Sequence, residues 1–271
     1  MTALAAPPLR DVIAAFRLDA RKKFGQHFLL DENLTAKIAR QAGDLAGRHV
    51  IEIGPGPGGL TRALLGTEAA HITAVEIDAR AADAIRALCL HAEGRLSLVE
   101  ADALATDLTT LAPAPRQIVA NLPYNVATPL LIGWLKQAAQ WERLTLMFQL
   151  EVAERIAAAP DTESYGRLAV LTQWTCDTAL LMRIPPAAFT PPPKIFSAVV
   201  GLIPKPVQPD PSLFAAMERL TAAAFGQRRK MLRGSLRALG GEALLARADI
   251  DPRRRAETLS VREFETLANM I

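Results

Sequence analysis

Cysteine, histidine and long apolar runs are all scarce in this sequence of 271 residues. The two cysteines, Cys89 and Cys176, lie far apart, so we expect neither a disulfide framework nor a cysteine metal cluster. The four histidines have no paired ligand spacing, so no metal site is predicted. The apolar stretches are short and interrupted by charges, and the first twenty residues lack a small-residue cleavage site. These absences favour a cytoplasmic protein without a membrane segment or a metal.

Aromatic residues are also few, at 5% of the chain, whereas hydrophobic residues reach 50% and charged residues 22%. This composition is globular, and the length suffices for one large domain and a small one. The formal net charge is only +3, but it is unevenly placed. Residues 205–271 hold twelve Lys and Arg against eight Asp and Glu, and residues 1–204 hold nineteen against twenty. A basic end suits a nucleic-acid partner, although a solvated charged face has the same composition.

Short apolar strands alternate with helical segments over the first 150 residues. A helix is expected at 31–42, where Asp31 fits the N-cap, and others from about 59 and at 79–90. The five predicted strands are residues 49–54, 71–78, 95–102, 116–123 and 143–149. This alternation is typical of a parallel sheet covered by helices on both faces. The fold class is therefore predicted to be α/β and Rossmann-like.

The pattern changes after residue 165. Two further strands, in TALLMRIP and SAVVGLIP, flank a proline-rich loop and are expected to end the sheet with an antiparallel pair. Beyond a linker at 204–211 the sequence is typical of helices. We predict a larger, catalytic domain over 1–204, in which 1–19 is an amphipathic helix or a tail, and a small helical domain over 205–271.

A glycine-rich loop, in IEIGPGPGGL, follows the first strand. Gly54, Gly56 and Gly58 let the backbone approach a ligand closely, and amides at the start of the next helix can donate hydrogen bonds to it. The same loop satisfies the G-x-G-x-x-G spacing of dinucleotide-binding enzymes through Gly54, Gly56 and Gly59. The loop alone therefore does not separate two kinds of nucleotide ligand.

Three acidic residues near strand ends narrow the choice between these two kinds of nucleotide ligand. Glu52 lies two residues before the first glycine, Glu76 ends the second strand and Asp102 ends the third. A carboxylate at position 76 can accept both ribose hydroxyls, and one at position 102 can accept an adenine amino group. Three acids around one pocket would repel the pyrophosphate of NAD but suit the sulfonium cation of S-adenosylmethionine. We therefore expect S-adenosylmethionine as co-substrate, with helix capping or loop solvation as the alternative role of Glu52 and Asp102.

The fourth strand ends in Asn121-Leu122-Pro123-Tyr124, at the sheet edge where such folds place their chemistry. An exocyclic amine of a base is a poor nucleophile because its lone pair is delocalised into the ring. The Asn121 amide oxygen and the Leu122 carbonyl can accept its two N–H bonds and direct the lone pair at a methyl group. Pro123 fixes the backbone, and Tyr124 offers a flat face to a flipped base. The stretch is predicted to clamp a target amine, with an ordinary turn beside a packed tyrosine as the alternative.

Seven segments of the chain resemble the ribosomal RNA adenine dimethyltransferase family. In unbroken order from about residue 20 to about 204, they are RKKFGQHFLLD, VIEIGPGPGGLT, VEID, EADAL, NLPYNVATPLL, YGRLAVLTQ and PPAAFTPPPKIFSAVV. The resemblance implies an S-adenosylmethionine-dependent enzyme that methylates N6 of two adjacent adenosines near the 3′ end of 16S rRNA, twice each. It also implies action on an immature 30S subunit late in assembly, and we expect the enzyme to be a monomer.

The resemblance assigns roles to residues that surround the methyl donor. It implies that His27 and Leu29 cover the donor and that Gly54 lies against it. Many relatives carry Asn where His27 stands. We also expect Glu52 and Gly56 to bind the methyl donor at this site.

Further roles concern the nucleoside of the donor and the target base. The resemblance implies that Glu76 binds the donor ribose, Asp102 its adenine, and Asn121 the methyl group and the target amine. Phe189 matches an aromatic that helps to hold the target base with Tyr124. A buried core phenylalanine is the alternative interpretation of Phe189.

Two basic clusters are candidates for RNA binding. The first is Arg21-Lys22-Lys23, at the expected pocket mouth, and the second comprises Arg228, Arg229, Lys230, Arg233 and Arg237. On one continuous helix, positions 229, 233 and 237 would recur every four residues and share a face. That spacing predicts an RNA-facing surface on the small domain, with a solvated face as the alternative.

Three other functions remain open from the sequence. A 23S rRNA adenine methyltransferase of the macrolide-resistance type shares the donor site and the Asn-Leu-Pro-Tyr motif, although FTPPPKIFSAVV and YGRLAVLTQ favour the small-subunit enzyme. A non-catalytic RNA-binding assembly or transcription factor would not need Glu76, Asp102 and Asn121 together. An NAD-dependent oxidoreductase is disfavoured by the acidic pocket.

Overall fold

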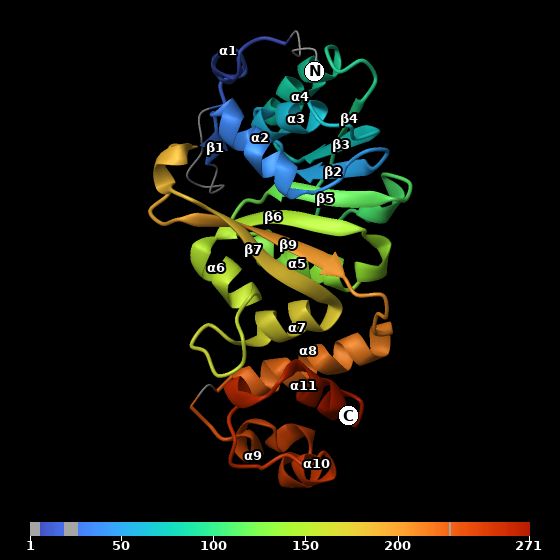
Figure 1. Cartoon of the computed structure of the whole chain (residues 1–271), viewed down its shortest axis with the longest axis vertical. Coiled ribbons are helices and arrows are strands. Elements are labelled where there is room, and N and C mark those ends of the chain that lie inside the picture. The colour runs from blue at the N-terminus through green and yellow to red at the C-terminus, as the bar shows by residue number, and fades with distance from the viewer. Residues whose placement is uncertain (1–5, 19–26, 228) are drawn as a thin grey trace.

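The computed structural model describes residues 6–18, 27–227 and 229–271. Over these residues, seven strands form one sheet in the order β4-β3-β2-β5-β6-β9-β7, which Figure 1 shows from β4 near the top to β7 and β9 near the middle. The strands are β2 (His49–Ile53), β3 (His71–Glu76), β4 (Leu96–Glu100), β5 (Arg116–Asn121), β6 (Arg143–Gln149), β7 (Cys176–Ile184) and β9 (Ser197–Pro204). Strands β2 to β6 are parallel, and β9 pairs antiparallel with both β6 and β7. The predicted α/β sheet with an antiparallel end is confirmed.

Helices cover both faces of this sheet (Figure 1). One apolar cluster joins side chains of α2 (Glu32–Gln41), α3 (Gly59–Leu65) and α4 (Ala79–Cys89) to one face. A second cluster joins α5 (Ala127–Leu135), α6 (Leu150–Ile156) and α7 (Arg167–Thr175) to the other. Successive residues of a strand point to opposite faces, so in β2 Val50 belongs to the first cluster and Ile51 to the second. A sheet buried on both faces explains why its strands read as nearly continuous apolar runs.

The N-terminal part of the chain lies over the same end of the sheet. Helix α1 (Leu9–Ala15) packs Val12 against Ala81 and Ala84 of α4. Helix α2 begins as expected, because the Asp31 side chain accepts hydrogen bonds from the amides of Asn33 and Leu34. A separate two-stranded sheet, β1 (Phe28–Leu29) with β8 (Phe189–Thr190), links this region to the loop before β9.

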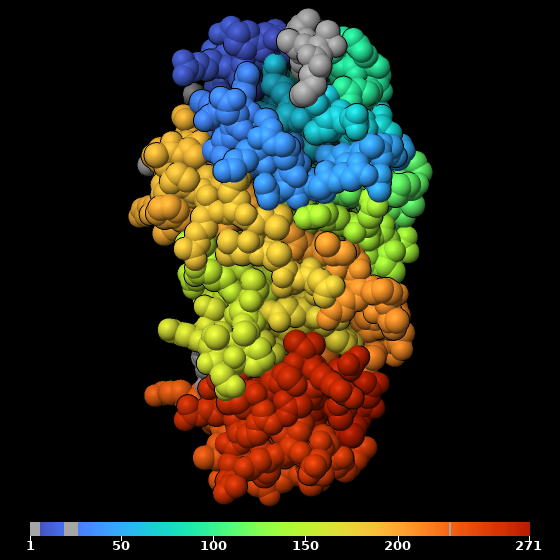
Figure 2. Space-filling model, in the orientation of Figure 1, coloured from blue at the N-terminus to red at the C-terminus, as the bar shows by residue number. Residues whose placement is uncertain are grey.

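Residues 211–268 form the helices α8 (Pro211–Phe225), α9 (Leu232–Ser235), α10 (Gly241–Arg247) and α11 (Val261–Ala268). Figure 2 shows these residues, in orange and red, packed directly against the rest of the molecule. The Phe225 ring stacks on Phe264 at 5.5 Å and meets Tyr165 edge-on at 6.1 Å. The Trp174 indole donates a hydrogen bond to Glu265 at 3.0 Å. The apolar cluster beneath α5–α7 therefore continues into the C-terminal helices without interruption.

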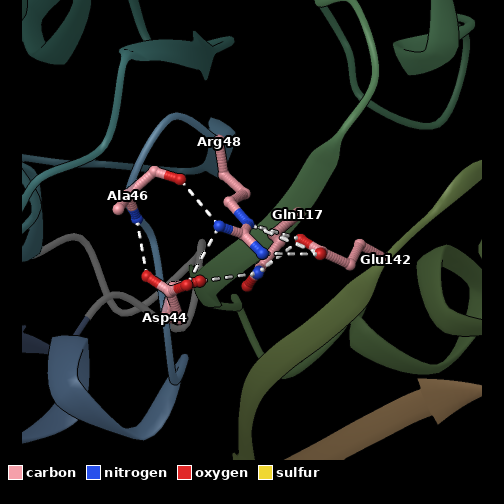
Figure 3. Close-up of polar contacts among 5 residues, drawn as sticks. All are labelled: Asp44, Ala46, Arg48, Gln117 and Glu142. Carbon is pink, nitrogen blue, oxygen red and sulfur yellow. Dashed lines mark hydrogen bonds and ion pairs between the residues drawn. The ribbon is translucent and has the colours of Figure 1, made fainter.

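A polar network ties three strands together at their amino ends (Figure 3). Arg48, just before β2, donates to Asp44, to the carbonyl of Ala46 and to Glu142, just before β6. Gln117 of β5 donates to Glu142 at 2.9 Å. These hydrogen bonds join the strands at the sheet edge opposite the glycine loop, so they brace the scaffold rather than the site.

We predict that Phe264→Ala lowers the stability of the whole chain in one transition. Phe264 is fully buried and stacks on Phe225, whose ring also meets Tyr165 of the preceding part, and deleting such a ring typically costs about 3–5 kcal/mol. Differential scanning calorimetry is the measurement, and Phe196→Ala, which removes a half-exposed ring, is the control. Two transitions, of which only one moves, would instead indicate that 205–271 unfolds as an independent domain. The division at residue 204 stays a prediction until then.

Candidate functional site

A cavity of about 590 Å³ opens at the sheet edge where the parallel strands β2, β3 and β5 end. Its volume falls in the usual range for small-molecule sites, about 300–1,000 Å³. Eleven of the residues singled out in the sequence line it: His27, Leu29, Glu52, Gly54, Gly56, Glu76, Asp102, Asn121, Leu122, Pro123 and Tyr124. The carboxyl ends of parallel strands meet at one edge, so the fold brings these separate motifs together.

The glycine loop forms one wall of the cavity. Gly54, Gly56 and Gly58 have φ angles of +64°, +54° and +90°, a region that side chains rarely adopt. A Cβ at Gly59 would stand only 2.6 Å from the carbonyl oxygen of Leu29. Glycine is therefore needed both for the path of the loop and for its close approach to β1.

Glu76, at the end of β3, holds this loop in place. One carboxylate oxygen accepts the Gly56 amide at 3.2 Å, and the other accepts the amides of Ile77 and Asp78, each at 2.9 Å. Burial raises the pKa of the Glu76 carboxyl, and the three amide donors oppose that shift. The carboxyl also faces the cavity, where it retains acceptor capacity for a ligand.

Glu52 lies deeper, at the end of β2, and is only 1% exposed. Burial raises the pKa of its carboxyl to about 8, an effect that the nearby Thr61 hydroxyl partly offsets. Its Oε2 atom has no hydrogen-bond partner among the described residues. With a pKa of about 8, the Glu52 carboxyl favours its protonated form at neutral pH, so the free pocket carries less negative charge than three ionised acids would give it. A buried carboxyl with one unpaired oxygen is still suited to a cationic ligand, which would favour its ionised form.

The outer part of the cavity combines one acid with apolar side chains. Asp102 is exposed, and its side chain accepts the Leu104 amide at 2.9 Å. Ile77 is 71% exposed and Leu104 51% exposed, and both line the cavity. The two exposed aliphatic side chains suit the faces of a planar base, and the carboxylate suits its amino edge. Sequence reasoning missed both, although an isoleucine between the two acids of VEID was an available signal.

Asn121 ends β5 beside the cavity. Its amide nitrogen donates to the carbonyl of His27 at 3.4 Å. A carbonyl can only accept, so this contact fixes which end of the side chain is nitrogen and leaves the amide oxygen available to accept. The predicted acceptor role of Asn121 therefore agrees with its orientation.

The aromatic residues are arranged differently from the expectation. Phe189 is 3% exposed and is not among the cavity-lining residues of the described chain. The His27 ring lies 5.5 Å from the Tyr124 ring and 6.3 Å from the Phe189 ring, and it lines the cavity. Its Nδ1 atom donates to the carbonyl of Pro191 at 2.8 Å. The expected direct role of Phe189 is therefore not supported, because pairing of β1 with β8 buries its ring and brings His27 next to Tyr124.

The predicted basic helix is not continuous, so the shared face of positions 229, 233 and 237 is wrong. Arg229 and Lys230 lie in a turn after α8, Arg233 is in the four-residue α9, and Arg237 begins a separate 3₁₀ turn. The break comes after Phe225, where α8 ends at Gly226, a poor helix former, and α9 begins only at Leu232. The four residues are exposed, and Arg233 pairs with Glu242 at 3.6 Å. Arg228 and the cluster Arg21-Lys22-Lys23 lie outside the described residues.

The described residues include neither a candidate membrane helix nor a candidate metal cluster. Within residues 6–18, 27–227 and 229–271 no helix has the length and apolar character needed to cross a bilayer. The same ranges contain no group of three His, Cys, Asp or Glu side chains able to hold a metal ion.

Comparison with known sequences identifies the family. The sequence profile described as Ribosomal RNA adenine dimethylase matches residues 17–271. A protein of Gluconobacter oxydans named Ribosomal RNA small subunit methyltransferase A is 63% identical over 269 residues, which cover 99% of this chain and 89% of that protein. The protein of the same name from Rhodospirillum rubrum is 54% identical over 98% of this chain and 92% of its own length.

Comparison with solved structures agrees. A dimethyladenosine transferase from Plasmodium falciparum superposes with a TM-score of 0.75 and 26% identity, covering 89% of this chain and 96% of its own. The 23S rRNA methyltransferase ErmE superposes with a TM-score of 0.65 and 26% identity, covering 89% and 98%. The site geometry, the profile match and these likenesses all agree, and the chain belongs to the ribosomal RNA adenine dimethylase family of S-adenosylmethionine-dependent methyltransferases.

Proposed function

We propose that this methyltransferase converts two adjacent adenosines near the 3′ end of 16S rRNA to N6,N6-dimethyladenosine, in an immature 30S subunit. The observation that carries the proposal is the position of Asn121 at the wall of an acid-lined cavity. The curated relatives, 54–63% identical over nearly the whole chain, support the small-subunit substrate. We further expect the enzyme to be a monomer and to work in the cytoplasm.

The cavity fits S-adenosylmethionine, which supplies an activated methyl group on a sulfonium. The Glu76 carboxylate would accept the ribose hydroxyls while it keeps its loop contacts. Ile77 and Leu104 would flank the adenine, and Asp102 would accept its amino group. Glu52 would face the positive charge, because its unpartnered oxygen lies at the buried end of the cavity.

Asn121 and Leu122 would act on the target amine. The Asn121 amide oxygen and the Leu122 carbonyl would accept its two N–H bonds, while Tyr124 stacks on the base. Two acceptors draw the nitrogen toward tetrahedral geometry, so its lone pair is directed at the methyl carbon. The new N–C bond would form as the C–S bond breaks, S-adenosylhomocysteine would leave, and the nitrogen would lose one proton to solvent. A second transfer to the same nitrogen then completes a dimethylated adenosine.

A 23S substrate is the second candidate, because ErmE shares the fold. Labelled S-adenosylmethionine, incubated separately with immature 30S particles and with 50S precursors, discriminates between the two. Label in the 30S particle, mapped to two neighbouring adenosines, is the expected result. Label confined to the 50S precursor would contradict the proposed substrate.

We predict that Asn121→Ala reduces single-turnover methylation by roughly a hundredfold or more, the usual value of one preorganised polar contact in a transition state. Donor affinity should change little, because the donor is bound mainly by the other walls. Asn33→Ala, an exposed change on α2, is the control. A loss smaller than threefold would remove Asn121 from the amine-binding role.

We predict that donor affinity rises with pH and depends on Glu52. The free carboxyl has a pKa of about 8, and a bound sulfonium would lower it. Below about pH 8, binding must therefore expel a proton, so affinity increases by up to about tenfold per pH unit and levels off above pH 8. Calorimetry between pH 6 and 9 measures this dependence. Glu52→Gln should abolish it, whereas Glu68→Gln, an exposed change, should not; a flat profile in the unmodified enzyme would contradict the role.

The exposed cations after α8 are the proposed RNA contacts. We predict that changing Arg229, Lys230 and Arg237 to Ala flattens the slope of log affinity for 30S particles against log salt by about two to three units, since each phosphate contact contributes about 0.7–0.9. Filter binding at several salt concentrations is the measurement. Donor affinity should not change, and an unchanged slope would mean that RNA docks on another surface.

A further inference from the structure

The hydroxyl of Tyr124 is held by a residue from a distant part of the chain. Tyr124 Oη lies 2.7 Å from Oγ of Ser197, 73 residues later. Ser197 is fully buried, whereas Tyr124 is half-buried and lines the cavity. The contact therefore runs from the cavity wall into the interior of the sheet.

Ser197 is a rigid anchor because of its position in the topology. It is the first residue of β9, which runs antiparallel to its neighbours and so begins at the edge where β5 and β6 end. Ser197 pairs with Gln149 of β6 on one side and with Ile184 of β7 on the other. The preceding carbonyl, of Phe196, accepts the Leu150 amide at 2.9 Å. A hydroxyl between two paired strands has little freedom to move.

Tyr124 has no comparable support from its own backbone. It lies in a turn between β5 and α5, where the amides of Val126 and Ala127 both donate to the carbonyl of Pro123. Beyond the Ser197 contact, its ring has the tilted His27 ring as a neighbour at 5.5 Å. Burial raises the pKa of the Tyr124 phenol, so the group stays protonated and remains able to donate. Among the residues that the structure describes, the Ser197 contact is the hydrogen bond that links this ring to the sheet.

We propose that Ser197 is a positioning residue for methyl transfer, which fixes the plane of the Tyr124 ring against which the target adenine stacks; this rests on the proposed function. A flat base can be aligned with Asn121 and the donor only if the ring beneath it keeps one orientation. Productive alignment is sensitive to small displacements, so a mobile ring slows the transfer without weakening attachment of the ribosomal particle. Ser197 itself does not touch either substrate.

The kinetic test is a double-mutant cycle with Ser197→Ala, Tyr124→Phe and the two combined. Each single change removes the same hydrogen bond, so each should lower the single-turnover rate on immature 30S particles by about three- to tenfold, the value of one such bond. The combined variant should be no slower than the slower single variant. Affinities for S-adenosylmethionine and for 30S particles should not change. Ser97→Ala, which alters a strand serine of β4 away from the cavity, is the control.

Losses that multiply in the combined variant would overturn the proposal, because they would mean that the two hydroxyls act separately. If Ser197→Ala does not fold, the test relies on Tyr124→Phe alone. The proposal requires the single-turnover rate of that variant to fall by the same factor. An unchanged rate would overturn the proposal. An unmodified enzyme that methylates no 30S adenosine would instead count against the proposed function.

A second measurement needs no ribosomal substrate. The chain has two tyrosines, Tyr124 and Tyr165, so protein labelled with 3-fluorotyrosine gives a ¹⁹F spectrum that the Tyr124→Phe variant assigns. Ser197→Ala should shift and broaden the Tyr124 signal and leave that of Tyr165, buried in another cluster, in place. An unchanged Tyr124 signal would show that Ser197 does not hold the ring and would overturn the proposal.

Discussion

The carboxylate of Glu76 accepts three main-chain amides at once, and the rest of the site is arranged around that cluster. Two of the donors begin the segment after β3, and the third belongs to the glycine loop after β2. Because one side chain joins both strand ends, it sets the width of the cavity between them. These donors offset part of the cost of burying a charge, which helps an acid to stand at this point in a mostly apolar interior.

The remainder of the site follows from strand direction. Strands β2, β3 and β5 run in parallel and deliver the glycine loop, Glu76 and Asn121 to one edge. The antiparallel β9 starts at that edge and supplies Ser197 to Tyr124, while β8 pairs with β1 and brings His27 to the same ring. The amino ends of the strands carry the Arg48 network instead, so bracing and chemistry occupy opposite edges of the sheet.

The sequence predicted correctly those features of the structure that a short segment determines. Apolar strands, the N-cap at Asp31 and the acids at strand ends were predictable because local pattern and topology alone position them. Burial was not predictable in the same way. Pairing of β1 with β8 buries Phe189, and the depth of Glu52 sets its protonation, and both depend on residues far along the chain. The predicted basic helix was wrong because α8 ends at Gly226 and the next helix, α9, has only four residues, so the four-residue spacing of charges falls on separate elements.

One buried carboxylate, that of Glu76, braces the loop, and we propose that it also binds the donor ribose. The most direct test compares S-adenosylhomocysteine with its 2′-deoxy analogue by calorimetry, on the unmodified enzyme and on Glu76→Gln, with thermal melting to check folding. The unmodified enzyme should bind the ribose form tighter by about tenfold or more, because a hydrogen bond to a charged group contributes about 1.5–3 kcal/mol. The folded Glu76→Gln protein should lose most of that preference. An equal preference in both proteins would contradict ribose binding by Glu76.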